Sequence, residues 1–140
     1  MSMKAQRGSV ALELMMVAPL FLLLLLFAVA GGRIVGARNH VLGAAQDAAR
    51  AASTYDDPAA AHHAATTTAT ASLEHAGLSC DRTDIAVDLS ALEPGGFVTV
   101  RVTCVANLAD LTFVGVPGSR TFTSHATEVV DLYRSERSGR

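Results

Sequence analysis

The chain has 140 residues and a formal net charge of −2 at pH 7; half of its residues are hydrophobic, aromatic residues are few and tryptophan is absent. Without a leader and a membrane span, about 100 residues remain, which is enough for one small domain and too few for two. The near-neutral charge gives no indication of nucleic acid or another polyanion as a partner.

An uninterrupted apolar block covers residues 14–32 and contains no charged side chain. At about 1.5 Å of rise per residue, a helix of this length crosses a bilayer core of about 30 Å. Residues 22–27 are apolar on every side, whereas a helix of a soluble protein is apolar along one stripe only. The block is therefore predicted to be a membrane span, or else a signal sequence that is removed.

Glu13 lies directly before this block. A carboxylate at the margin of an apolar span is energetically costly, and such a residue by default has a partner and a function. The alternative is that Glu13 sits at the level of the lipid headgroups and is simply solvated.

The residues around Glu13 form a recognisable pattern. Residues 7–13 read Arg-Gly-Ser-Val-Ala-Leu-Glu, and after four residues come Ala-Pro-Leu and a leucine run. This order resembles the processing site of type IV pilins and pseudopilins, and among them the TadE-like minor pilins of tight-adherence (Tad/Flp) pilus systems. The resemblance covers residues 7–38, and the remainder is similar only in length and general plan.

The resemblance implies that a prepilin peptidase cuts between Gly8 and Ser9 on the cytoplasmic side. Ser9 would become the first residue of the mature chain and Glu13 the fifth. In related pilins, this glutamate is thought to neutralise the N-terminal amine of an adjacent subunit. The implied partners are therefore the membrane, prepilin peptidase, other pilins or pseudopilins and pilus-assembly proteins, with no nucleic acid and no cofactor.

The expected location is the cytoplasmic membrane, crossed once, with the N-terminus in the cytoplasm and the C-terminal domain outside it or displayed in a surface pilus. Lys4 and Arg7 favour a cytoplasmic N-terminus. Arg33 and Arg38 on the far side of the block blur this charge rule. The orientation therefore rests on the leader motif.

Two other interpretations stay open. The small residues Ala28-Val29-Ala30 resemble a signal-peptidase site, so a small secreted binding domain with a disulfide could be released after Ala30. The third interpretation is a single-span anchor that is never processed. The three predict different N-termini, at Ser9, Gly31 and Met1.

The membrane helix is predicted to continue beyond the span. Small and apolar residues recur at helical intervals between residues 33 and 53, namely Ile34, Val41, Ala45, Ala48 and Ala52. Residues 9–53 are therefore predicted to form one rod of about 65 Å, which Pro19 is expected to kink. The leader is assigned to residues 1–8.

Residues 54–133 are predicted to form an exported α+β domain, followed by a polar tail at residues 134–140. A second helix is expected over residues 59–75, between Asp57-Pro58 and Gly77. Apolar alternation then predicts a hairpin of strands around residues 85–89 and 98–104. A third strand is expected over residues 120–133, with one face formed by Phe122, Ala126, Val130 and Leu132. The connection at residues 107–118 fits a short helix or a strand. The predicted fold class is thus α+β, with a long membrane-spanning helix, a second helix and a three-stranded antiparallel sheet.

Cys80 and Cys104 are the two cysteines of the chain, and both follow the span. An even pair in an exported domain predicts a disulfide, with two free thiols as the alternative. In an antiparallel hairpin, the numbers of two directly paired residues have a constant sum. This sum is odd if the apolar faces of the two strands lie on the same side of the hairpin. The sum of 80 and 104 is even, so Cys80 and Cys104 would not be directly paired in such a register. The bond therefore requires a bulge, or a Cys80 that precedes the strand.

Signatures of catalysis are missing from the sequence. It contains no G-x-S-x-G, no P-loop, no paired carboxylate site and no zinc signature, so we expect no enzyme activity. His62, His63 and His75 are expected to be solvated helix residues, not metal ligands. Asp81, Asp84 and Asp88 are expected to form a solvated strand face.

Overall fold

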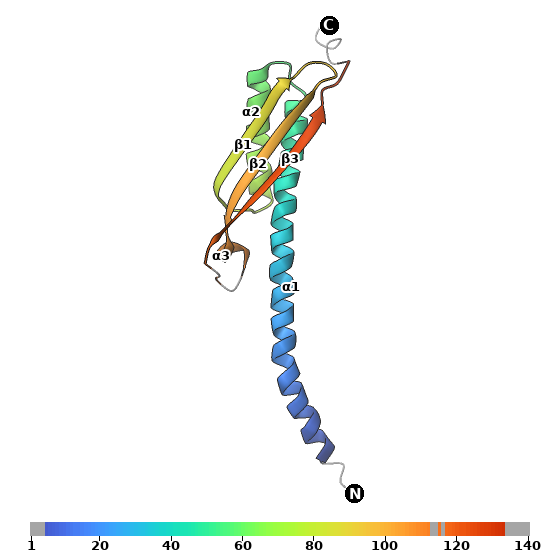
Figure 1. Ribbon diagram of the computed structural model, residues 1–140, viewed down its shortest axis with the longest axis vertical. Helices are drawn as coiled ribbons and strands as arrows, with labels where there is room; N and C mark the ends of the chain where they lie inside the picture. The colour runs from blue at the N-terminus through green and yellow to red at the C-terminus, as the bar shows by residue number, and fades with distance from the viewer. Residues whose placement is uncertain (1–4, 113–114, 116, 134–140) are drawn as a thin grey trace.

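The computed structural model describes residues 5–112, 115 and 117–133, and describes the exposure of side chains from residue 12 onward. Residues 1–4 of the predicted leader and the predicted polar tail at residues 134–140 lie outside the described residues. Figure 1 shows one long helix that carries a small helix-and-sheet domain at its C-terminal half. The elements are, in order, α1 (Ala5–Ala52), α2 (Pro58–His75), β1 (Cys80–Ala91), β2 (Phe97–Asn107), α3 (Leu108–Leu111) and β3 (Ser119–Val129). The predicted α+β fold class is confirmed.

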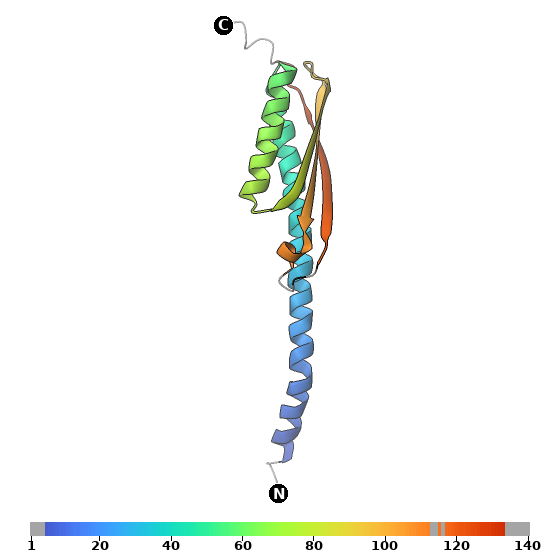
Figure 2. The ribbon, with the colours of Figure 1, turned by 90° about the vertical axis from the view of Figure 1, so that its left-hand side faces the viewer.

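Helix α1 is continuous over 48 residues, or about 70 Å, and includes residues 5–8, which the sequence analysis assigned to the leader. Pro19 lies inside α1, and the helix continues through it without a break. The ribbon curves toward its N-terminal end (Figure 1). Figures 1 and 2 agree that the N-terminal half extends away from the domain, while the C-terminal half lies against α2 and the sheet.

Helix α2 has the expected start and stop. The Asp57 side chain accepts a hydrogen bond from the Ala60 backbone N–H at 2.8 Å, and Pro58 occupies the first turn, where it costs no hydrogen bond. Gly77 follows the helix with a φ of +66°, a conformation that favours glycine. The threonines that lower helix propensity are accommodated locally, since the Thr70 hydroxyl donates to the carbonyl of Thr66.

The sheet is antiparallel with the order β1-β2-β3, so β2 is the central strand. Ile85 pairs with Val102 and Thr83 with Cys104, which gives the odd sum expected for a hairpin with one apolar face. The register then shifts between Cys80 and Arg82. The parity argument is confirmed, because a bulge at the start of β1 resolves the mismatch between the two cysteines.

The core lies between the two helices and the inner face of the sheet, and small side chains dominate it. Helix α1 contributes Val41 and a series of alanines, and α2 contributes alanines and Leu73. Because alanine adds only one carbon to the backbone, the helices can approach each other and the sheet closely. The sheet contributes the larger buried side chains, namely Val98, Val100, Val102, Cys104 and Phe122, and Val130 is buried directly after β3.

The third strand is shorter than predicted. It ends at Val129, and Val130 exchanges backbone hydrogen bonds with the hairpin turn, from its N–H to Gly96 and from the Gly95 N–H to its carbonyl. These bonds join the end of β3 to the turn between β1 and β2. Leu132 is 65 % exposed, so its assignment to the buried face of the strand was wrong.

The connection after β2 begins as a helix. Asn107 accepts a hydrogen bond from the Ala109 N–H at 2.9 Å and caps the short helix α3. The Thr112 N–H and hydroxyl both bond to the Leu108 carbonyl and close the turn. Residues 113–114 and 116 of this connection lie outside the described part of the chain.

Candidate functional site: the N-terminal helix

The apolar side chains of the N-terminal half of α1 are exposed. From Leu12 to Val29 the large apolar side chains are between 41 and 80 % exposed, with Leu26 and Phe27 at the two limits. Within the described residues, one helical stretch, Leu12–Ala52, is long and apolar enough to cross a membrane, and none of its apolar window is buried inside the protein. A core helix of a soluble protein would be mostly covered. This half of α1 is therefore a candidate membrane anchor.

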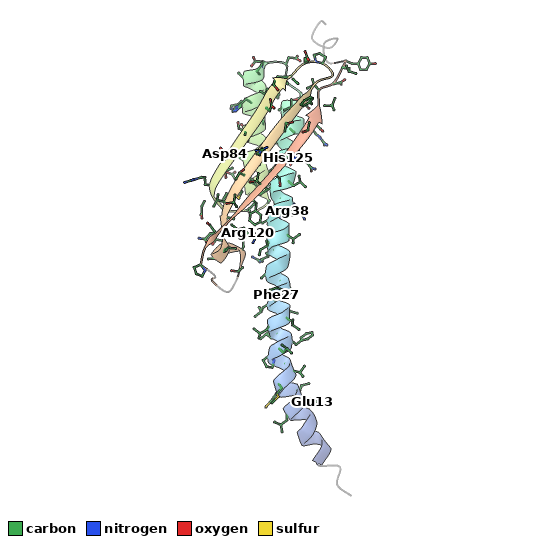
Figure 3. All side chains as sticks on the ribbon, in the orientation of Figure 1. Glu13, Phe27, Arg38, Asp84, Arg120 and His125 are labelled. Atoms are coloured by element: carbon green, nitrogen blue, oxygen red, sulfur yellow. A yellow bond between two sulfur atoms is a disulfide. The ribbon has the colours of Figure 1, made fainter. Side chains whose placement is uncertain are left out.

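Glu13 is the acidic residue on this anchor. It is exposed on the helix surface, and Figure 3 shows it near the N-terminal end, far from the domain. Among the described residues, no hydrogen bond or ion pair involves the Glu13 carboxylate. In lipid, this carboxylate would need a partner.

Gly8 and Ser9 lie in the first turns of α1, and the structure describes their backbone as helical. Ser9 precedes Glu13 by four residues, which places the two on the same side of the helix and about 6 Å apart along its axis. The arrangement brings together the predicted cleavage site and the predicted assembly residue. A free amine at Ser9 would add a positive charge one turn away from the carboxylate.

Cys80 and Cys104 form a disulfide with a Cα–Cα distance of 5.4 Å. The bond joins the start of β1 to the buried side of β2, where Cys104 is fully buried. It lies in the domain, near the end of the sheet where α3 begins, and far from Glu13. Its role is therefore to hold the β1–β2 hairpin closed.

The other residues that the sequence analysis considered as ligands do not form a common site within the described part of the chain. His62 and His63 are exposed on α2, and His75 lies at its C-terminal end. Within the described ranges, no group of three or more His, Cys, Asp or Glu side chains is arranged to hold a metal ion. The Asp88 carboxylate accepts a hydrogen bond from the Ser90 backbone N–H at 3.0 Å, and this bond lowers the pKa of Asp88.

Sequence reasoning missed the contacts that hold α1 to the domain. Arg50 forms an ion pair with Glu128 of β3, and the Ser72 hydroxyl of α2 donates to Asp47 of α1 at 2.9 Å. Arg50 and Glu128 are 78 residues apart, and Asp47 and Ser72 are 25 residues apart, so no local sequence pattern predicts these contacts. They link the C-terminal end of α1 to β3 and to α2 at the surface.

The comparisons with known proteins give one match. Residues 8–50 match the family model described as TadE-like protein, a segment that begins at Gly8 and contains Glu13, the apolar block and most of the packed half of α1. No curated protein and no solved structure matches the chain. Over residues 8–50, the chain is thus similar to TadE-like proteins.

Proposed function

We propose that this chain is a minor pilin-like subunit or assembly factor of a Tad/Flp-type pilus. In this proposal, prepilin peptidase removes residues 1–8 and leaves Ser9 as the new N-terminus. The span at residues 14–32 anchors the chain in the cytoplasmic membrane, with the N-terminus in the cytoplasm. The α+β domain lies outside and contacts other pilins, pseudopilins or pilus-assembly proteins. The chain acts as a structural component and not as an enzyme.

The observation that carries the proposal is the division of α1 into two halves. Its C-terminal half supplies buried residues to the domain from Ala37 onward, whereas the apolar side chains before residue 30 are exposed. One acidic residue, Glu13, interrupts the apolar surface just after the Gly8-Ser9 pair. A rigid domain carried on an exposed apolar rod is suited to lateral packing of rods, either with lipid or with other subunits.

Glu13 would act through charge neutralisation. Either a carboxylate or an ammonium group alone is strongly disfavoured in an apolar bundle, and pairing offsets the cost of desolvating both. In the proposal, the Ser9 amine of one subunit pairs with Glu13 of a neighbour. Processing would thereby create the cation that assembly needs.

The secreted alternative is supported by one feature of the same helix. The first residue of α1 that packs on the core is Ile34, and the first fully buried one is Ala37. Cleavage after Ala30 would therefore leave the packed half of α1 intact and release a folded domain. The N-terminus of the mature chain separates this alternative from the pilin-like one.

The test uses four variants expressed in the host and extracted from its membranes. Intact-mass spectrometry should show wild-type chain without residues 1–8, and Gly8→Leu should keep them. Gly31→Leu is the matched control: the structure has open space around Gly31, so this variant should lose residues 1–8 as wild type does. Loss of residues 1–8 from Gly8→Leu would contradict the proposed cleavage site.

The third variant, Glu13→Ala, tests assembly. It should be cleaved like wild type, because the cleaved bond lies outside the substitution, but it should fail to enter pilus or pilus-assembly fractions. Glu13→Asp keeps the charge and should retain part of the assembly. Normal assembly of the Glu13→Ala variant would contradict the role given to this carboxylate.

A further inference from the structure

A groove with two arginines lies where α1 leaves the apolar span and meets the sheet. It is lined by Ile34 and Arg38 of α1 and by Arg120, Thr121, Phe122 and Thr123 of β3, and it encloses about 400 Å³. Figure 3 shows Arg38 and Arg120 close together at the end of the sheet that faces the N-terminal half of α1. We call this feature the arginine groove.

The arginine groove combines positive charge with an apolar lining. Arg38 and Arg120 are exposed, whereas Phe122 is buried and Ile34 is half-buried. No acidic side chain is among the residues that line it. Among the described residues, neither arginine takes part in an ion pair or a side-chain hydrogen bond. An amphiphilic anion therefore suits the groove better than a small, fully hydrated one.

Along α1, the arginine groove lies just outside the headgroup layer that a membrane would have around the apolar block. The apolar block ends at Gly32, and Arg38 follows six residues later, about 9 Å further along the helix axis. The headgroup region of one leaflet is roughly 5–8 Å thick outside a hydrocarbon core of about 30 Å. A long arginine side chain can direct its guanidinium back toward that layer.

The end of the domain that faces the N-terminal half of α1 lies close to the end of the apolar block. Asp110 and Leu111 of α3 share a groove with Val29 and Gly32 of α1. These α1 residues are the last of the apolar block, so α3 lies at the outer limit of the proposed hydrocarbon core. The domain would therefore rest on the membrane surface, with the arginine groove opening toward the lipid phosphates.

We propose that the arginine groove binds the phosphate of an anionic phospholipid in the leaflet from which the domain emerges. Arg38 and Arg120 bind the phosphate oxygens, and guanidinium groups do so with paired, directional hydrogen bonds. Ile34 and Phe122 contact the apolar part of the same lipid. This binding fixes the height and tilt of the rod in the membrane, and it rests on the membrane insertion of α1 proposed above.

The experiment uses the full-length chain in nanodiscs made from equal parts of phosphatidylcholine and phosphatidylglycerol. After mild detergent extraction, native mass spectrometry identifies the retained lipid by its mass. Wild-type chain should retain phosphatidylglycerol in preference to phosphatidylcholine. The preference should fall about five-fold for Arg38→Gln and for Arg120→Gln, and further for the double variant.

Arg101→Gln is the matched control. Arg101 is an exposed arginine on the opposite face of the sheet from the core, where it pairs with His125, and it does not line the groove. Its substitution removes the same charge and should leave the lipid preference unchanged. Because all three arginines are exposed, thermal unfolding should show the same stability for each variant.

Each of the following results would overturn the proposal. One is an unchanged preference for phosphatidylglycerol in the double variant, and another is an equal loss in Arg101→Gln. The third is displacement of the retained lipid by inorganic phosphate, which would assign the groove to a free anion. A chain that does not co-purify with the nanodiscs would contradict the membrane anchor itself. A chain that co-purifies without a lipid preference contradicts only the arginine groove.

Discussion

Arg50, in the last turn of α1, donates from Nε to Oε1 of Glu128 in β3 at 3.3 Å and ties the end of the rod to the edge of the sheet. The two side chains are 78 and 38 % exposed, respectively, so water and salt screen the pair. We expect Arg50→Gln or Glu128→Gln to change the free energy of unfolding by less than about 1 kcal/mol. Urea denaturation measures this, and a much larger loss would mean that the ion pair and not the core holds the rod.

The alanine-lined core should resist enlargement. Ala48 of α1 is fully buried, so Ala48→Leu must push apart elements that are already in contact. We expect a destabilisation of about 1–3 kcal/mol, seen as a lower urea midpoint. Gln46→Leu, at an exposed position of the same helix, is the control and should have little effect. Equal stability of both variants would contradict close packing at Ala48.

Loss of the disulfide should weaken the domain without changing its fold. Cys80 and Cys104 are 24 residues apart, and opening a loop of this size costs about 3 kcal/mol in the chain-entropy estimate. The Cys80→Ala/Cys104→Ala double variant should show this loss in urea denaturation. Reduction of the two cysteines in the wild-type chain should lower the urea midpoint of unfolding in the same way. An unfolding midpoint that does not respond to reductant would show that the hairpin closes without the bond.

The Asp88 carboxylate gives a small pH dependence of known sign. The Ser90 backbone N–H, and secondarily the Ser90 hydroxyl, lower its pKa below the ordinary value. Because the folded-state pKa is the lower one, the stabilising contribution is present above the ordinary carboxyl pKa of about 4 and is lost as the pH falls through the folded value. NMR titration should find a lowered pKa that persists in large part in Ser90→Ala, which keeps the backbone donor. A pKa at or above the ordinary value would contradict the hydrogen bond.

Structural features that depend on residues close together in the chain were predictable from the sequence. The second helix follows from Asp57-Pro58 before it and Gly77 after it, and the odd register sum of the hairpin predicted the bulge that the structure has beside Cys80. These signals lie within a few residues of the feature they specify. The rod was placed from Ser9 onward because cleavage is expected before that residue, whereas the helix of the uncleaved chain begins at Ala5.

Features that depend on tertiary contacts were not predictable. Leu132 continues the apolar alternation of the third strand, but the strand ends at Val129 and Leu132 is exposed. Likewise, nothing in the sequence places Arg120 beside Arg38, since only the packing of β3 along α1 brings them together. The candidate assembly site is the opposite case, because Gly8, Ser9 and Glu13 all lie within one short motif.

The central claim is that processing creates a cation to match Glu13, and the N-terminus of the native chain tests it most directly. We predict that the polypeptide isolated from its host membrane begins at Ser9, as read by N-terminal sequencing and by intact mass. A chain that begins at Gly31 would instead be a secreted domain, and one that begins at Met1 an unprocessed anchor. Either of these two results would contradict the pilin-like account.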